Sequence, residues 1–143
     1  MKEIGKVTLK IENLYSMYFK CPITEIPYVK MAEQELRGNP PMHNSGYYVY
    51  IKKEYDRGVE VFGSIKTEKQ LKDRYEEWKK LIESINKGYK ENKKYEVYEN
   101  GLPYGCITAI LKDDKIQVVD GHHRLAILLA LGYDEVDITL FRE

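Results

Sequence analysis

The stretch that decides the fold is Val118-Val119-Asp120-Gly121-His122-His123-Arg124-Leu125-Ala126, which joins an apolar strand to an apolar helix. An acid, a glycine, two histidines and an arginine therefore stand at the amino end of a buried helix. Such an end presents free backbone N–H groups and the positive end of the helix dipole, so it can hold a phosphate. A cation such as Arg124 in the first turn is mildly unfavourable against that dipole, and a bound anion would remove the conflict.

The sequence around this stretch predicts a strand–helix–strand unit. Residues 115–119 and 135–141 have the composition and alternation of strands, and the almost wholly apolar segment 122–131 is typical of a buried helix. This spacing favours a parallel crossover between the two strands. Upstream, residues 104–111 predict another strand, and Asp113-Asp114 predict the turn that connects it to the next one.

A second helix is predicted over residues 68–87. Thr67 is a suitable N-cap, Gln70 stands where a capping box requires it, and Gly88 is a suitable residue to end the helix. The charged residues of the opposite face are expected to be solvated. The apolar stripe that marks the buried face consists of Leu71, Tyr75, Trp78, Leu81, Ile82 and Ile85.

The amino-terminal third is predicted less sharply because four prolines interrupt it. A short strand is expected at 6–11 and a short helix at 31–36, within an arm formed by residues 1–46. Residues 47–55 are rich in β-formers, and together with 59–65 they predict a hairpin.

Composition narrows the class of protein. A chain of 143 residues with 43% hydrophobic and 32% charged residues is ordinary for one globular domain. Its zero net charge argues against avid nucleic-acid binding, which requires phosphate neutralisation. Cys21 and Cys106 form no paired motif, so neither a disulfide framework nor a zinc site follows. With no signal peptide and no membrane-length apolar run, a cytoplasmic location without membrane contact is expected.

The tract DGHHRLAILLALG, residues 120–132, strongly resembles the phosphate-binding turn of the ParB/sulfiredoxin superfamily. The preceding helix, with Leu81-Ile82-Glu83-Ser84-Ile85 and Gly88, and the strands that follow it occur in the order of that superfamily. The resemblance covers roughly residues 60–141. It implies an α+β nucleotide-binding domain over residues 47–143, with a mixed sheet, two principal helices and a C-terminal strand–helix–strand, on which the 1–46 arm packs.

Three branches of the superfamily differ at this turn. Sulfiredoxins carry a reactive cysteine where this chain has His122, which disfavours sulfinic-acid reduction. Chromosome-partition ParB proteins continue into a helix-turn-helix domain, whereas this sequence stops soon after its last strand. Free serine kinases have the same Asp-Gly-His-His-Arg turn, and they carry an essential glutamate at the start of the upstream helix, where Glu68 stands here.

The two carboxylates implied in catalysis have simpler alternatives. Asp120 would hold Mg²⁺ or accept a proton from the attacking hydroxyl, or it would merely cap the following helix. Glu68 would share that work, or it would only stabilise the first turn of its helix. Other polar residues that could reach the site are Glu25, Glu33, Glu35, His43, Tyr47, Thr67 and Lys69.

The remaining residues of the turn are expected to hold the donor phosphates. Gly121 lets the backbone approach a ligand closely. His122 and His123 point in different directions, so they are not expected to share a metal. One or both are expected to donate to phosphate oxygens and to neutralise charge, with a structural role for a buried histidine as the alternative. Arg124 would bind phosphate as a planar fork, with a salt bridge to an acid as its alternative.

The sequence therefore predicts a nucleotide-dependent phosphotransferase that acts on a small hydroxyl-bearing molecule, a free amino acid such as serine being the leading candidate. ATP, ADP or CTP would be the donor, with Mg²⁺ bridging its phosphates. The alternatives are a nucleotide-binding regulator without turnover, and a ParB-like nucleic-acid-binding or nuclease domain. The absence of a basic stripe weighs against the last of these.

Overall fold

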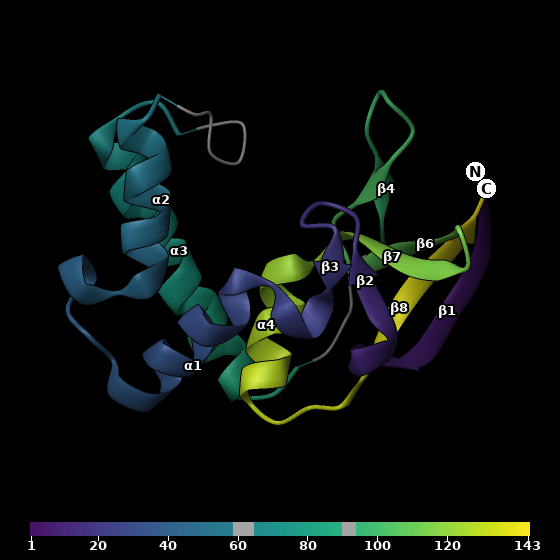
Figure 1. The fold of residues 1–143 in the computed structure, drawn as a ribbon, viewed down its shortest axis with the longest axis horizontal. Helices are drawn as coiled ribbons and strands as arrows, with labels where there is room; N and C mark the ends of the chain where they lie inside the picture. Colours follow the sequence, from purple (N-terminus) through teal and green to yellow (C-terminus); the bar gives the residue numbers. More distant parts are fainter. Residues whose placement is uncertain (59–64, 90–93) are drawn as a thin grey trace.

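The computed structural model describes residues 1–58, 65–89 and 94–143. A six-stranded mixed sheet, ordered β1-β8-β6-β7-β2-β3, forms one side of the molecule, and three of its four α-helices gather on the other (Figure 1). The helix α4 lies between the two groups. The strands of the large sheet are β1 (Lys2–Lys10), β2 (Leu14–Ser16), β3 (Cys21–Pro22), β6 (Thr108–Lys112), β7 (Lys115–Asp120) and β8 (Glu135–Arg142).

The remaining elements complete an α+β architecture. β4 and β5 form a separate two-stranded antiparallel hairpin. Four helices, rather than the expected two principal ones, are present in the described residues. The elements are α1 (Pro27–Gly38), α2 (Gly46–Asp56), α3 (Glu68–Asn86), α4 (His122–Ala130), β4 (Glu96–Val97), β5 (Pro103–Tyr104) and the short 3₁₀ turns at Ile11–Asn13, Ile23–Glu25 and Met42–Asn44. In the described residues no helix is both long and apolar enough to cross a bilayer.

The local signals of the carboxy-terminal half correspond to real elements. α3 begins after Thr67, whose hydroxyl accepts the N–H of Gln70 while the Gln70 side chain accepts the N–H of Thr67, so the capping box is confirmed. β6 and β7 form an antiparallel hairpin whose turn residues, Asp113 and Asp114, have φ of 54° and 59°. Two consecutive left-handed residues are the requirement of a tight type I′ hairpin turn.

The expected parallel crossover between β7 and β8 is wrong. β6 lies between them, antiparallel to β7 and parallel to β8, so β7 and β8 run in opposite directions. The tight hairpin turn places β7 on one side of β6, and α4 then carries the chain back to the other side. The parallel crossover therefore runs from β6 through β7 and α4 to β8.

The predicted strand at 47–55 is also wrong, because this segment is the helix α2. Ser45 caps the helix by accepting the N–H of Tyr48. Tyr47, Tyr48 and Ile51 are buried, whereas Val49 is 39% exposed, a pattern that fits a helix and not an alternating strand. Burial of the aromatic side chains thus overrides their preference for strands. Most of the second half of the predicted hairpin, 59–64, lies outside the described residues.

Residues 1–46 contribute strands to the main sheet instead of forming an arm that packs on a separate core. β1 pairs along almost its whole length with β8, and β2 pairs in parallel with β7. The predicted strand at 6–11 lies largely within β1, and the helix expected at 31–36 is the middle of α1, which packs on α4. The boundary expected at residue 46 is not visible in the sheet, which takes strands from both sides of it. This arrangement fixes the amino end of α4 against both α1 and β2.

Candidate functional site

A cavity of about 720 Å³ opens between α3 and the amino end of α4. Asp120, Gly121, His122, His123 and Arg124, which the sequence places in the phosphate-binding turn, all line it. The structure therefore brings these five residues to one space. The wall opposite them is formed by one face of α3.

Gly121 is fixed by both its backbone angles and its neighbours. It is the N-cap of α4, with φ of 100° and ψ of 16°, in the region that favours glycine. A Cβ at this position would stand 2.8 Å from Cγ1 and 3.0 Å from Cα of Ile107, which is closer than real Cβ contacts. Because Gly121 is the cap, the alternative interpretation of Asp120 as the N-cap is wrong. Among the described residues, no side chain caps this end of α4 by a hydrogen bond, which fits a site for an external anion.

Asp120 and Arg124 both hydrogen-bond to the backbone of the same residue, Gly105. The backbone N–H of Gly105 donates to Asp120 Oδ2 at 2.8 Å, and Arg124 Nη2 donates to the carbonyl oxygen of Gly105 at 3.4 Å. The two side chains are thereby held on the cavity wall with opposite charges. Carboxylate oxygens have further lone pairs beyond that hydrogen bond, so Asp120 can still accept a proton or bind a cation.

The two histidines are held by different partners. His122 Nε2 lies 2.8 Å from Ser16 Oγ, and Ser16 also accepts the N–H of Phe19. His123 Nε2 lies 3.1 Å from the hydroxyl of Tyr47, which reaches the site as expected, but from the helix α2 and not from the amino-terminal arm. The two adjacent imidazoles therefore point toward separate partners, one on β2 and one on α2.

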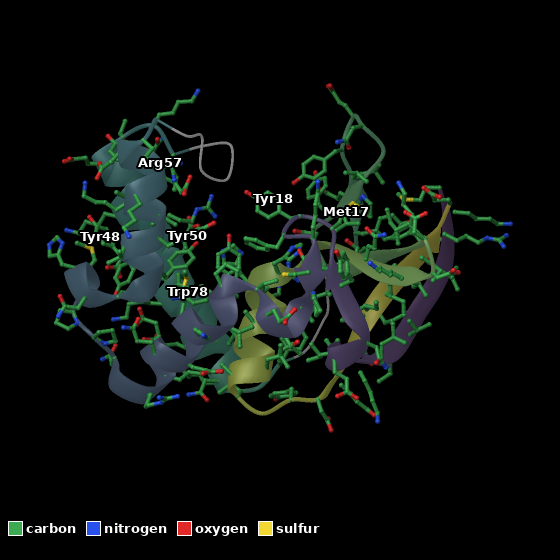
Figure 2. All side chains as sticks on the ribbon, viewed as in Figure 1. Met17, Tyr18, Tyr48, Tyr50, Arg57 and Trp78 are labelled. Carbon is green, nitrogen blue, oxygen red and sulfur yellow. The ribbon has the colours of Figure 1, made fainter. Side chains whose placement is uncertain are left out.

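Aromatic rings fix the plane of His123. Tyr28 stacks on it with ring centroids 4.3 Å apart, and Tyr47 in turn stacks on Trp78 at 4.4 Å. The rings come from α1, α2 and α3, so three helices determine the position of one imidazole on α4. Figure 2 shows Trp78 near the junction of these helices.

Burial keeps both histidines neutral at physiological pH. Burial lowers the pKa of His122 to about 4, against the opposing effect of Asp120. Burial, with Arg74 next in importance and then His122 and Arg124, lowers the pKa of His123 to about 3. In the ligand-free protein these side chains are therefore neutral hydrogen-bonding groups, and the positive charge comes from arginine. The expectation that they neutralise phosphate charge concerns the ligand-bound protein and stays a prediction.

α3 contributes polar and charged residues to the cavity that are not among the site residues predicted from the sequence. Arg74, Glu77 and Ser84 line the cavity together with Trp78 and Leu81. Arg74 Nη1 lies 3.5 Å from Glu77 Oε2, one turn along the helix. Arg74, Glu77 and Ser84 each stand three or four positions from a residue of the apolar stripe, on the same side of the helix. This spacing was the sequence signal that could have placed them beside the buried face.

Glu68 lies away from this group. It is the first residue of α3, nine positions before Glu77, which corresponds to about 14 Å along the helix. The residues that line the cavity, among those the structure describes, do not include it. It is near Lys52 of α2, whose pKa is raised first by a hydrogen bond to Asp56 and to a smaller degree by Glu68.

The other candidates from the amino-terminal half, and the two beside the α3 cap, have different surroundings. Glu35 is buried and accepts a hydrogen bond from Ser45. Thr67 caps α3, and Lys69 pairs with Asp73 at 3.1 Å. The remaining members, Glu25, Glu33 and His43, are not among the described residues that line the cavity.

The side chains that line the cavity determine which kind of metal ion it could hold. Within the ranges 1–58, 65–89 and 94–143, no group of three or more His, Cys, Asp or Glu side chains is placed to hold an ion. Mg²⁺ does not require such a cage, because it is usually held by one or two carboxylates together with substrate phosphates and water. Asp120 and Glu77 line the same cavity and provide carboxylates of this kind, so the residues fit Mg²⁺ delivered with a nucleotide.

Comparison with known families found no matching family model, and comparisons with curated proteins and with solved structures found no match either.

Proposed function

We propose that this chain is a nucleotide-dependent phosphotransferase that moves a phosphoryl group from ATP, ADP or CTP to a small hydroxyl-bearing molecule. The observation that carries the proposal is the composition of one cavity of about 720 Å³. It joins the uncapped amino end of α4 to two arginines on different helices, Arg74 and Arg124, and to the carboxylate of Asp120. This volume lies in the usual range of small-molecule sites, roughly 300–1,000 Å³.

Phosphate binding follows from this arrangement. The N–H groups of the first turn of α4 point along the helix axis toward the cavity end, and Gly121 presents no side chain there. Arg124 and Arg74 supply planar forks that match phosphate oxygens, and the neutral imidazoles of His122 and His123 can donate hydrogen bonds. Phosphoryl transfer depends mostly on such positioning and charge stabilisation, so a prearranged set of donors is the main requirement.

The carboxylates have the remaining role. The acceptor hydroxyl oxygen would attack the terminal phosphorus, its proton would pass to a carboxylate, and the bond from that phosphorus to the bridging oxygen would break, so that the shortened nucleotide leaves. Asp120 is the first candidate for the base because Gly105 orients it in the cavity. We infer that Glu77, which lines the cavity, is better placed than Glu68 to share this work. Mg²⁺, when bound by these carboxylates, would supply charge neutralisation on the phosphates.

The resemblance of residues 120–124 to the turn of free serine kinases supports the same proposal. It makes serine the first acceptor to be tested, and it makes a ParB/sulfiredoxin-like fold the proposed finer description of the α+β architecture. Because likeness of fold or motif does not by itself establish an activity, the main support for the proposed function is the set of residues that line the cavity.

The test is direct detection of product. The protein is incubated with Mg²⁺, with ATP, ADP or CTP, and with a panel of amino acids and sugars, and phosphorylated product is followed by ³¹P NMR. Transfer should be lost in Asp120→Asn and strongly reduced in Glu77→Gln. It should persist in Glu76→Gln, which removes the neighbouring exposed carboxylate outside the cavity. Loss of transfer in Glu68→Gln but not in Glu77→Gln would return the second carboxylate role to Glu68.

Other outcomes favour the alternatives. Tight nucleotide binding without product from any acceptor would favour the regulator. Salt-sensitive DNA binding that no nucleotide changes would favour the nucleic-acid-binding domain. Absence of nucleotide and phosphate binding altogether would contradict the proposal.

A further inference from the structure

A large aromatic side chain is exposed next to one of the residues that line the cavity. Tyr18 lies in the turn between β2 and β3 and is 73% exposed. Phe19 contacts its ring at a centroid distance of 4.8 Å and an angle of 87°, which leaves much of the ring surface open to solvent. Burial energy does not explain a tyrosine in this position, because little of its area is removed from water.

Tyr18 is one ring away from the proposed phosphate site. Its centroid lies 6.4 Å from that of His122, and His122 lines the cavity. Phe19 also contacts His122, at 5.9 Å, so the turn that carries Tyr18 is anchored to the first residue of α4. In a nucleotide a single sugar separates the base from its first phosphate. A ligand with its phosphates at the amino end of α4 therefore has a planar group within reach of Tyr18.

The surroundings of Tyr18 are aromatic on the helical side as well. Tyr50 on α2 is within electrostatic range of Tyr18: burial first, and then Tyr18, raises the pKa of Tyr50. Tyr28 contacts Tyr50 edge-on at 6.0 Å and stacks on His123. Figure 2 shows Tyr18 between the sheet and the helices that carry Tyr50 and Trp78. Aromatic rings on the β2–β3 turn, α1 and α2 therefore occur on this side of the molecule, and an exposed ring among them offers a stacking surface to a flat, π-bonded ligand.

We propose that Tyr18 is the platform on which the base of the bound nucleotide stacks. The proposal depends on the phosphate-binding part of the proposed function. Every nucleobase has a π-face, so stacking alone gives weak preference among bases. The subsite therefore binds ATP and CTP with similar affinity, and it adds affinity for nucleotides over inorganic polyphosphate.

Calorimetric titration with the Mg²⁺ complexes of ATP, CTP and inorganic tripolyphosphate distinguishes the contribution of the base to the binding affinity from that of the phosphates. Tyr18→Ala should weaken ATP and CTP about tenfold, because loss of one stacking contact has roughly that effect, and it should leave tripolyphosphate unchanged. Tyr18→Phe, which keeps the ring, should bind like the wild type. Tyr133→Ala removes another exposed tyrosine, 42% exposed and outside the residues that line the cavity, and serves as the matched control. The single tryptophan, Trp78, lines the cavity and gives an independent fluorescence signal of binding.

Each contrary outcome has a definite meaning. Unchanged ATP affinity in Tyr18→Ala would overturn the stacking platform, and so would equal weakening of ATP and tripolyphosphate, because Tyr18 would then act only through His122. Weakening in Tyr18→Phe equal to that in Tyr18→Ala would assign the effect to the hydroxyl and also overturn it. If the wild type binds tripolyphosphate but ATP no more tightly, the phosphate site remains and this inference fails. If it binds none of the three, the proposed function itself fails.

Discussion

The sharpest quantitative prediction concerns Gly121→Ala. A methyl group there would meet Ile107 at 2.8 Å from Cγ1 and 3.0 Å from Cα, and the residue would also have to hold φ at 100°. The left-handed conformation costs a non-glycine residue about 1–2 kcal/mol. Overpacking against a buried neighbour adds about 1–3 kcal/mol, because Ile107 is fully buried and its Cα belongs to the backbone. The free energy of unfolding should therefore fall by about 2–5 kcal/mol, a large fraction of the stability of an ordinary domain.

Urea unfolding followed by circular dichroism measures this change, and Gly132→Ala is its matched control. Gly132 also has a left-handed φ, of 94°, but nothing lies within 4 Å of a Cβ built there. The control should lose only the conformational part, about 1–2 kcal/mol. Equal losses in the two variants would show that Ile107 does not press on Gly121, and the close approach at the start of α4 would be refuted. Tripolyphosphate affinity should fall in Gly121→Ala and not in Gly132→Ala.

Three other predictions concern the surroundings of the site. The pKa values of His122 and His123 are lowered in the folded protein, so the unfolded chain binds protons before the folded protein does as the pH falls. The stability that the two neutral histidines contribute is therefore present above the ordinary histidine pKa of about 6.5, and it is lost as the pH falls toward their pKa values in the folded protein. Between pH 7 and pH 5 each histidine should remove about 2 kcal/mol from the free energy of unfolding, and glutamine at both positions should flatten this dependence in urea titrations. Ser16→Ala removes the buried partner of His122 and of the Phe19 N–H, so it should cost about 1–3 kcal/mol in the same assay, and an unchanged stability would contradict these hydrogen bonds. Thr67→Ala removes the α3 cap and should cost about 1 kcal/mol while tripolyphosphate affinity stays unchanged, since the cap is outside the cavity lining.

The elements that could be predicted from the sequence depend on local features, whereas those that could not be predicted depend on contacts between distant segments. α3 could be predicted almost to its ends because its cap, Thr67 with Gln70, and its apolar stripe are local features. The β6–β7 hairpin could be predicted for the same reason, since two aspartates between apolar runs mark the turn. α2 could not, because tyrosine-rich Gly46–Asp56 has local strand preference, and only packing against α1 and α3 makes it helical.

The candidate site shows the same distinction between local features and long-range contacts. The cluster from Asp120 to Arg124 is contiguous, so its chemistry could be predicted from order alone, and the structure places all five residues on one cavity. Arg74 and Glu77 stand more than forty positions upstream, and only the packing of α3 beside α4 brings them there. The protonation of the histidines was likewise outside the reach of the sequence, because burial sets it.

By itself the sequence determined the elements with strong local periodicity and the grouping of acid, glycine, histidines and arginine at the turn that begins α4, because both depend on neighbours within a few residues. Tertiary structure alone decided that β8 lies between β1 and β6, that residues 1–46 contribute to the main sheet, and which distant side chains meet the turn. The physical reason is that strand pairing and the burial of charged groups depend on contacts between segments far apart in the chain. Local propensities are too weak to specify such contacts.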